Sequence, residues 1–232
     1  MLSPPRAAEL VHRAREAGAE LRHATSALLL SREPDDGSGR VTALLEGPRA
    51  VGLLRCRLVL VASGAHDASP SFGNNDLPGI FSARAALHLL RAGISLGKRV
   101  ALVGDGRFSR AFAEAQKQKG VFRFEPERVL RAKGQHRVTR LVYDEAGKTR
   151  ELVVSAIAID GHGAPATELL GQLGVRMRFD AARGYLPELS AEGRGEDAVF
   201  AAGSCAASAK PSGDDGARVA HELLMMLAEG SR

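Results

Sequence analysis

Two glycines and a serine at fixed spacing, Gly104, Gly106 and Ser109, form the pattern in this chain that points most directly to chemistry. They follow the apolar run KRVALV (98–103) and precede a segment with helical spacing of apolar residues that extends to Lys119. The first glycine permits a tight turn, the second lets a phosphate approach the backbone, and the small serine allows close helix packing. Because a helix N-terminus offers free N–H groups and partial positive charge, the pattern predicts a pyrophosphate-binding turn.

The remaining residues of the turn, Asp105, Arg107 and Phe108, belong to the same predicted cofactor site. Asp105 adds negative charge beside the phosphate position, whereas Arg107 can offset that charge and reach a phosphate directly. The alternative interpretation is a glycine turn that only packs a helix on a sheet. Phosphate binding requires that no side chain fill the mouth of this helix.

An acidic residue that binds the ribose is expected about 20 residues further along, at the end of the second strand. Glu125, which ends the stretch VFRFE, has this spacing. The same strand can instead belong to the following hairpin, and Glu125 would then be only a surface charge. Arg123 and Arg128 lie nearby and can accept a 2′-phosphate, so the sequence leaves NAD and NADP both open.

Apolar strands that alternate with helical segments predict an α/β fold. Residues 57–65, 98–103 and 198–202 are continuous apolar runs, typical of strands that are covered on both faces. Helical spacing appears over residues 83–92 and again after the glycine turn. The polar residues 33–40 predict a turn between two antiparallel strands.

Two other strand ends carry small residues: Ser63 and Gly64 after the first apolar run, and Gly203 and Ser204 after the last. The carboxyl ends of strands are where α/β sheets bind ligands, so these four residues are candidate cofactor contacts. The alternative is a pair of ordinary strand-to-loop turns.

Composition excludes several function classes. The net charge of +5 comes from dispersed arginines, and aromatic residues make up 4% of the chain with no Trp, which argues against nucleic acid as a partner. Cys56 and Cys205 provide neither a disulfide framework nor metal-ligand spacing, and no catalytic side chain can be assigned. No apolar run is long enough to cross a bilayer and the N-terminus has no secretory pattern, so a cytoplasmic protein is expected.

From residue 58 to residue 109, the stretches LVLVASGAHDASPSFGNNDLPGIFSARAALHLL and RVALVGDGRFS resemble FAD/NAD(P)-dependent oxidoreductases of the pyridine-nucleotide-disulfide type. The resemblance is greatest to the alpha-subunit group of heterotetrameric sarcosine oxidase, opine oxidase and hydrogen cyanide synthase. Residues 161–175 and 198–206 resemble the segments in which that group returns to its flavin-type fold.

The resemblance implies that Ser63 and Gly64 lie near FAD and that Gly203 and Ser204 approach the ribityl phosphate region of the flavin. It also implies that Gly104 and Gly106 lie under the phosphates of a second dinucleotide. Two residues depart from the family pattern: Ser204 stands where the family has an aspartate, and Ser63 stands where it has a threonine.

The expected architecture is a three-layer, Rossmann-like fold for FAD and NAD(P). Residues 1–78 with 183–232 would form an incomplete FAD-type lobe, which lacks the N-terminal GxGxxG unit for the ADP half of FAD. Residues 79–182 would form an inserted NAD(P)-type lobe, shortened after Gly120.

The resemblance implies a subunit of a flavin- and nicotinamide-dependent oxidoreductase that oxidises an amine or amino-acid-like small molecule. Its cofactors would be FAD, NAD(P) or both, held by this chain alone or only in complex with another oxidoreductase subunit. The alternatives are a non-catalytic structural subunit with degenerate cofactor sites, and a truncated or split gene product.

Overall fold

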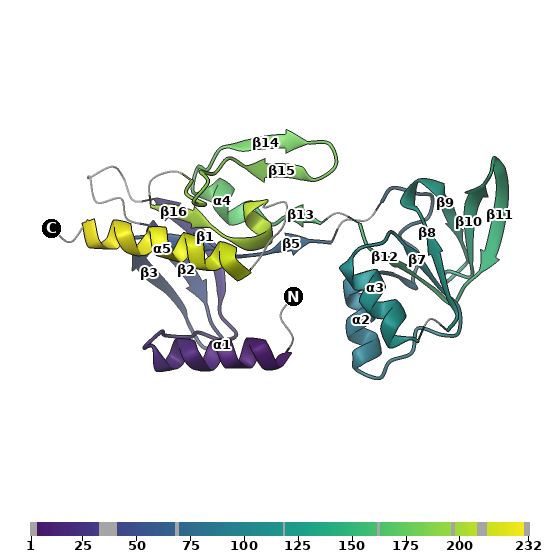
Figure 1. The fold of residues 1–232 in the computed structure, drawn as a ribbon, viewed down its shortest axis with the longest axis horizontal. Coiled ribbons are helices and arrows are strands. Elements are labelled where there is room, and N and C mark those ends of the chain that lie inside the picture. Colours follow the sequence, from purple (N-terminus) through teal and green to yellow (C-terminus); the bar gives the residue numbers. More distant parts are fainter. Residues whose placement is uncertain are drawn as a thin grey trace.

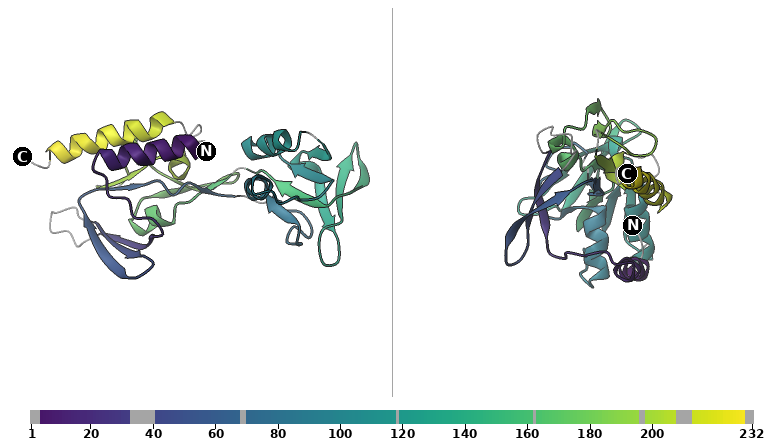
Figure 2. Two further views of the ribbon diagram at one scale, coloured as in Figure 1. Left: turned by 90° about the horizontal axis from the view of Figure 1, so that it is seen from below. Right: turned by 90° about the vertical axis from the view of Figure 1, so that its left-hand side faces the viewer.

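The chain folds into two lobes that two short strands connect (Figure 1). The computed structural model describes residues 4–32, 41–67, 70–117, 119–161, 163–195, 198–207 and 213–229. The connecting strands, β5 (Ala65–His66) and β13 (Ala164–Pro165), pair antiparallel. The first and last helices both lie on the same side of this connection, in the first lobe (Figure 2).

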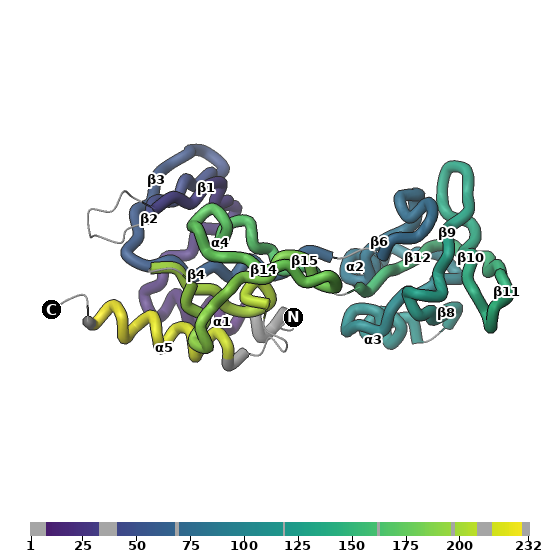
Figure 3. Tube along the Cα trace, turned by 90° about the horizontal axis from the view of Figure 1, so that it is seen from above, coloured from purple at the N-terminus to yellow at the C-terminus, as the bar shows by residue number. Residues whose placement is uncertain are grey.

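The first lobe contains the following elements: α1 (Pro4–Glu16), β1 (Ser26–Arg32), β2 (Val41–Glu46), β3 (Val51–Cys56), β4 (Val59–Val61), α4 (Glu168–Gln172), β14 (Met177–Asp180), β15 (Gly184–Pro187), β16 (Val199–Ala201), the 3-10 turn η2 (Gly203–Ala206) and α5 (Gly213–Glu229). The second lobe contains β6 (Ile80–Ser82), α2 (Ala83–Arg91), β7 (Val100–Val103), α3 (Arg107–Ala115), β8 (Val121–Phe124), the 3-10 turn η1 (Pro126–Arg128), β9 (Val129–Lys133), β10 (Arg140–Glu145), β11 (Lys148–Val153) and β12 (Ala156–Ile159). Figure 3 shows the same division along the Cα trace.

The second lobe has three layers around a parallel sheet of order β6-β12-β7-β8. Successive strand residues point to opposite faces, so the all-apolar strand β7 contributes side chains to two cores, one on each face of the sheet. Its Leu102 packs toward α2 and α3, whereas its Val103 packs toward the antiparallel sheet β11-β10-β9. Both side chains are fully buried, which explains why this strand reads as an uninterrupted apolar run.

Local residues set the limits of the two helices in this lobe. Ser82 caps α2, because its hydroxyl oxygen accepts the Ala85 N–H at 3.1 Å. Helix α3 ends at Ala115, earlier than the expected end at Lys119. The reason is Lys117, whose φ of +52° is left-handed and ends the helical hydrogen bonding.

The first lobe is built around the parallel pair β4 and β16. Phe200 of β16 packs toward α5, while its neighbours Val199 and Ala201 pack toward β1, β2 and α4. Strands β1 and β2 pair antiparallel as expected, and the predicted turn at 33–40 lies outside the described residues.

The predicted strand at 57–65 is wrong in its length. The structure divides it into β4 and β5, with Gly64 at φ +84° between them. A positive φ interrupts an extended strand, and here it directs the chain from the first lobe into the connection.

The predicted extent of the second lobe, 79–182, also needs correction. Leu170, Leu173 and Val175 pack in one core with Val41 and Val199 of the first lobe. The segment after β13 therefore belongs to the first lobe, because its buried side chains have their partners there. This placement agrees with the resemblance of residues 161–175 to a flavin-type fold.

Candidate functional site

The glycine turn between β7 and α3 has the tight geometry that its sequence predicts. Gly104 has φ +91°, and a Cβ added there would lie 2.3 Å from the carbonyl oxygen of Asp160. Ser109 is fully buried, and its hydroxyl donates to the carbonyl oxygen of Gly106 at 2.9 Å. A larger residue at either position would separate the helix from the sheet.

Asp160, which sequence analysis did not identify, lies at the mouth of α3. Its Oδ2 accepts the backbone N–H of Ser109 at 2.7 Å. A Cβ added to Gly106 would lie 2.4 Å from the carboxyl carbon of Asp160 and 2.5 Å from each carboxyl oxygen. The space beside Gly106 is thus occupied by the side chain of Asp160.

Strand order is the signal that would have identified Asp160. Strand β12 pairs in parallel with β7, and Ile159 is in register with Val103. The residue after Ile159 therefore meets the residue after Val103 at the same sheet edge. Sequence alone does not show this pairing, because β8, β9, β10 and β11 lie between the two strands in the chain.

The charges of the turn are paired differently from the sequence expectation. Asp105 forms ion pairs with Arg110 at 3.2 Å and Arg123 at 3.0 Å. Arg107, expected to offset Asp105, instead lies over the ring of Phe108 at 4.6 Å from its centroid. Because Arg123 is paired with Asp105, it is less available for a 2′-phosphate than the sequence suggested.

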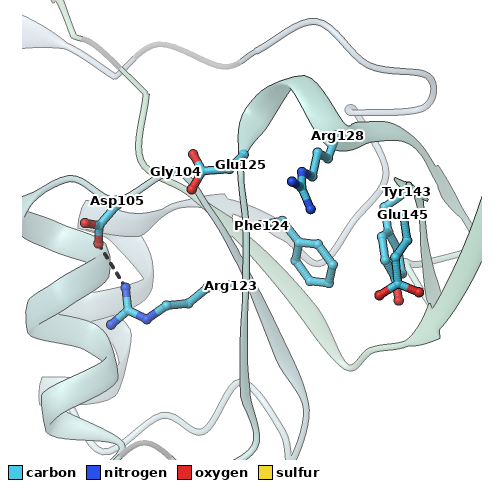
Figure 4. Close-up of a pocket in the computed structure, with 8 residues that line it drawn as sticks. All are labelled: Gly104, Asp105, Arg123, Phe124, Glu125, Arg128, Tyr143 and Glu145. Atoms are coloured by element: carbon cyan, nitrogen blue, oxygen red, sulfur yellow. Dashed lines mark hydrogen bonds and ion pairs between the residues drawn. The ribbon is translucent and has the colours of Figure 1, made fainter. Parts of the chain in front are cut away.

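Glu125 lies beside the glycine turn at the end of β8. This strand pairs in parallel with β7, so the alternative that it belongs to the following hairpin is wrong. Glu125 lines a cleft of about 640 Å³ together with Gly104, Asp105, Arg128 and Tyr143. Figure 4 shows the Glu125 carboxylate close to Gly104 and on the same side of β8 as the Asp105–Arg123 ion pair, whereas Phe124 extends to the other side.

A second cleft, of about 490 Å³, lies between the lobes. Gly64 and Ser204 line it from the first lobe, and Gly106, Arg107 and Asp160 line it from the second. The structure therefore brings together candidate residues from three separate strand ends.

Two candidates lie elsewhere. Ser63 does not line this cleft; its hydroxyl donates to the carbonyl oxygen of Ala166 at 2.7 Å and fixes the β5–β13 connection. Gly203 lines a neighbouring cleft with Asp215 and Arg218.

Arg84 links α2 to the connecting strand. Its Nε donates to Asp67 Oδ1 at 2.9 Å, and its Nη2 donates to the carbonyl oxygen of Ala65 at 3.0 Å. Partial burial alone would raise the pKa of Asp67. Hydrogen bonds from Arg84 and Ser82, together with the charge of Arg84, outweigh that effect and lower this pKa.

The substitution Arg84→Met tests this link. A lowered folded-state pKa of Asp67 stabilises the protein above the unfolded-state pKa of about 3.9, and this contribution is lost as pH falls through the folded-state value. We expect the variant to lose about 0.2–1 kcal/mol of unfolding free energy at pH 7, as for other partly exposed ion pairs. In urea titrations the difference from wild type should shrink as pH falls below the unfolded-state pKa of about 3.9 and through the lower folded-state pKa of Asp67.

Arg91→Met, at the exposed C-terminal end of the same helix, is the matched control and should show no such pH dependence. A difference between wild type and Arg84→Met that stays constant from pH 7 to pH 3 would contradict the assignment.

Other candidate chemistry finds no support in the described residues. Cys205 is fully buried, and its sulfur contacts the carbonyl oxygens of Val61 and Ala202 at 3.2 and 3.3 Å. Within the described ranges no group of His, Cys, Asp or Glu side chains could hold a metal ion. Among the helices described, none combines the length and apolar character that a membrane crossing needs.

Comparison with known proteins identifies relatives by structure. No protein-family model and no curated protein matches the chain. L-proline dehydrogenase from P. horikoshii superposes with a TM-score of 0.71 and 26% identity, over 89% of this chain and 41% of that chain. The thioredoxin reductases of T. acidophilum and Lactococcus lactis have TM-scores of 0.70 and 0.72 with 16% and 13% identity. They cover 96% and 97% of this chain and 80% and 81% of their own.

The chain thus spans less than half the length of the proline dehydrogenase chain that it matches. The expected fold class is confirmed: the protein has the Rossmann-like fold of FAD- and NAD(P)-binding oxidoreductases.

Proposed function

We propose that this chain is a subunit of a flavin-dependent oxidoreductase that acts on an amine or amino-acid-like substrate together with a partner chain. The observation that carries the proposal is the 26% identity with L-proline dehydrogenase over 89% of this chain. The resemblance of residues 58–109 to the sarcosine oxidase alpha-subunit group supports the same substrate class. We also propose that the chain belongs to that group, that it works with a partner chain and that it is located in the cytoplasm.

The cleft between the lobes has room for part of a flavin cofactor. A Cβ added at Gly64 would meet no atom within 4 Å, so the backbone is open at this position of the cleft. Ser204 and Arg183 line the cleft beside Gly64 and supply hydrogen-bond donors. When bound, FAD would accept the electrons of the substrate; the chain's own residues would hold and orient it.

The visible absorbance spectrum of the purified protein tests the proposal. We expect flavin bands when the chain is co-expressed with the products of adjoining genes. Gly64→Leu should weaken flavin retention at least about tenfold, because the new side chain would fill the cleft. The control is Gly18→Leu, since Gly18 has the same φ of +84° and equally open surroundings but does not line the cleft.

Two results would overturn the proposal. One is the lack of flavin in every preparation, including any complex that co-purifies. The other is equal loss of flavin in the Gly64 and Gly18 variants, because backbone strain and not occupation of the cleft would then be responsible.

A second candidate function is a non-catalytic structural subunit that keeps the fold without working cofactor sites. Two observations favour it: Asp160 fills the mouth of α3, and Ser204 stands where the resembled family has an aspartate. The same preparations discriminate the candidates. A complex that assembles through this chain, while the chain itself lacks flavin and nucleotide, would support the structural role.

A further inference from the structure

The fold of the second lobe implies a nicotinamide dinucleotide whose pyrophosphate rests on the N-terminus of α3. In that arrangement phosphate oxygens accept N–H groups of the first helical turn and lie against the second glycine of the turn. In this chain the N–H groups of the first helical turn of α3 include that of Ser109, and the second glycine of the turn is Gly106. The groups that lie at the N-terminus of α3 decide whether such a ligand fits.

The Asp160 carboxylate lies in the phosphate position. It accepts the Ser109 N–H at 2.7 Å, and both of its oxygens lie within 2.5 Å of where a Cβ on Gly106 would be. A phosphate placed against Gly106 would overlap this carboxylate. Since both groups are anionic, their charges also repel one another.

The backbone of Asp160 is held by the sheet. Its backbone N–H donates to the carbonyl oxygen of Val103 at 2.8 Å, and its own carbonyl oxygen lies against Gly104. The carboxylate therefore extends from a backbone that is hydrogen-bonded to the adjacent strand. The helix dipole and the Ser109 N–H both stabilise its negative charge at this end of α3.

We propose that the second lobe of this chain does not bind NAD(P) through the α3 N-terminus, because Asp160 occupies the phosphate position as an internal anion. The lobe keeps the glycine turn because Gly104 and Gly106 must accommodate the backbone and the carboxylate of Asp160. The residues thus do not fit the dinucleotide that the fold implies. This inference rests on the fold and the turn, and it is independent of whether flavin binds in the cleft between the lobes.

A gain of binding tests the proposal. ADP and NADH are titrated into wild type, Asp160→Gly and Asp160→Asn, with calorimetry and melting temperature as the readouts. We expect no saturable binding to wild type at millimolar ligand and at least about tenfold tighter binding by Asp160→Gly, because the overlap and the like charge are both removed. Asp160→Asn keeps the bulk but removes the charge, and it should gain less.

Asp105→Ala is the matched control. Asp105 is another acid of the same turn, but it is paired outward with Arg110 and Arg123, so its removal should not create binding. Wild type that binds ADP or NADH as tightly as Asp160→Gly would overturn the proposal. Folded Asp160→Gly that still binds neither nucleotide would also overturn it, since the carboxylate would not be the obstacle. If Asp160→Gly does not fold, Asp160→Ala decides, because it also removes the carboxylate and its bulk: gain of binding supports the proposal, and its absence overturns it.

The absorbance spectrum of each preparation separates this result from that of the proposed function. Flavin bands without nucleotide binding by wild type would support both proposals. A lack of flavin together with gained nucleotide binding in Asp160→Gly would overturn only the proposed function.

Discussion

Gly104→Ala is expected to be among the most destabilising single substitutions near the glycine turn, whereas Gly106→Ala should be much milder. At Gly104 the backbone has φ +91°, and the new Cβ would lie 2.3 Å from the backbone oxygen of Asp160. The left-handed conformation and the overlap together should cost roughly 2–6 kcal/mol of unfolding free energy. At Gly106 the φ of −78° suits alanine, and the collision is with a carboxylate that can rotate away. We expect a cost of about 1–3 kcal/mol there, mainly from the lost hydrogen bond to Ser109.

The Asp160→Gly background distinguishes the two effects in denaturant unfolding. The cost of Gly106→Ala should largely disappear there, because the carboxylate that it displaces is gone. The cost of Gly104→Ala should persist, because it arises from a backbone oxygen that glycine retains. If both costs persist, or both disappear, the assignment of Asp160 to the mouth of α3 is wrong.

Phe112→Ala and Phe200→Ala are expected to cost about 3–5 kcal/mol each, as large-to-small changes in a well-packed core. Both rings are fully buried. Phe112 packs against Ala83, Ala86 and Leu87 in the second lobe, and Phe200 packs against Val219 in the first. Because the two cores share no residue, hydrogen exchange should show each substitution destabilising mainly its own lobe.

Phe179→Ala is the control for loss of a phenyl ring. Phe179 is 68% exposed, and its replacement should change the stability by less than about 0.5 kcal/mol. Equal loss of protection in β7 and β16 after Phe112→Ala would contradict two separately packed cores.

Fold class was predictable because buried parallel strands carry a strong local pattern. Strand β7 is apolar at every position, since helices cover one face and an antiparallel sheet covers the other. The limits of the elements were less predictable. Gly64 divides one apolar run into two strands, and Lys117 ends α3 early, in both cases through a positive φ that composition does not reveal.

Lobe boundaries depend on contacts between residues that are distant in the sequence. Leu170, Leu173 and Val175 are apolar and would suit either lobe by composition. They belong to the first lobe because their packing partners include Val41, Val61 and Val199. The sequence does not show these contacts, and for this reason the boundary predicted at residue 182 was wrong.

By itself the sequence determined the α/β class and the strand–turn–helix order at Gly104–Ser109, and it indicated Glu125 as the residue expected beside that turn. These features follow from neighbouring residues: glycine spacing, apolar periodicity and strand-to-helix order. What occupies the mouth of α3 was decided only by the tertiary structure. Asp160 lies 51 positions after Ser109 in the chain, and it reaches the helix because β12 pairs beside β7. Pairing of parallel strands is set by the packing of the whole lobe, so a local motif predicts a phosphate site without revealing that a distant carboxylate fills it.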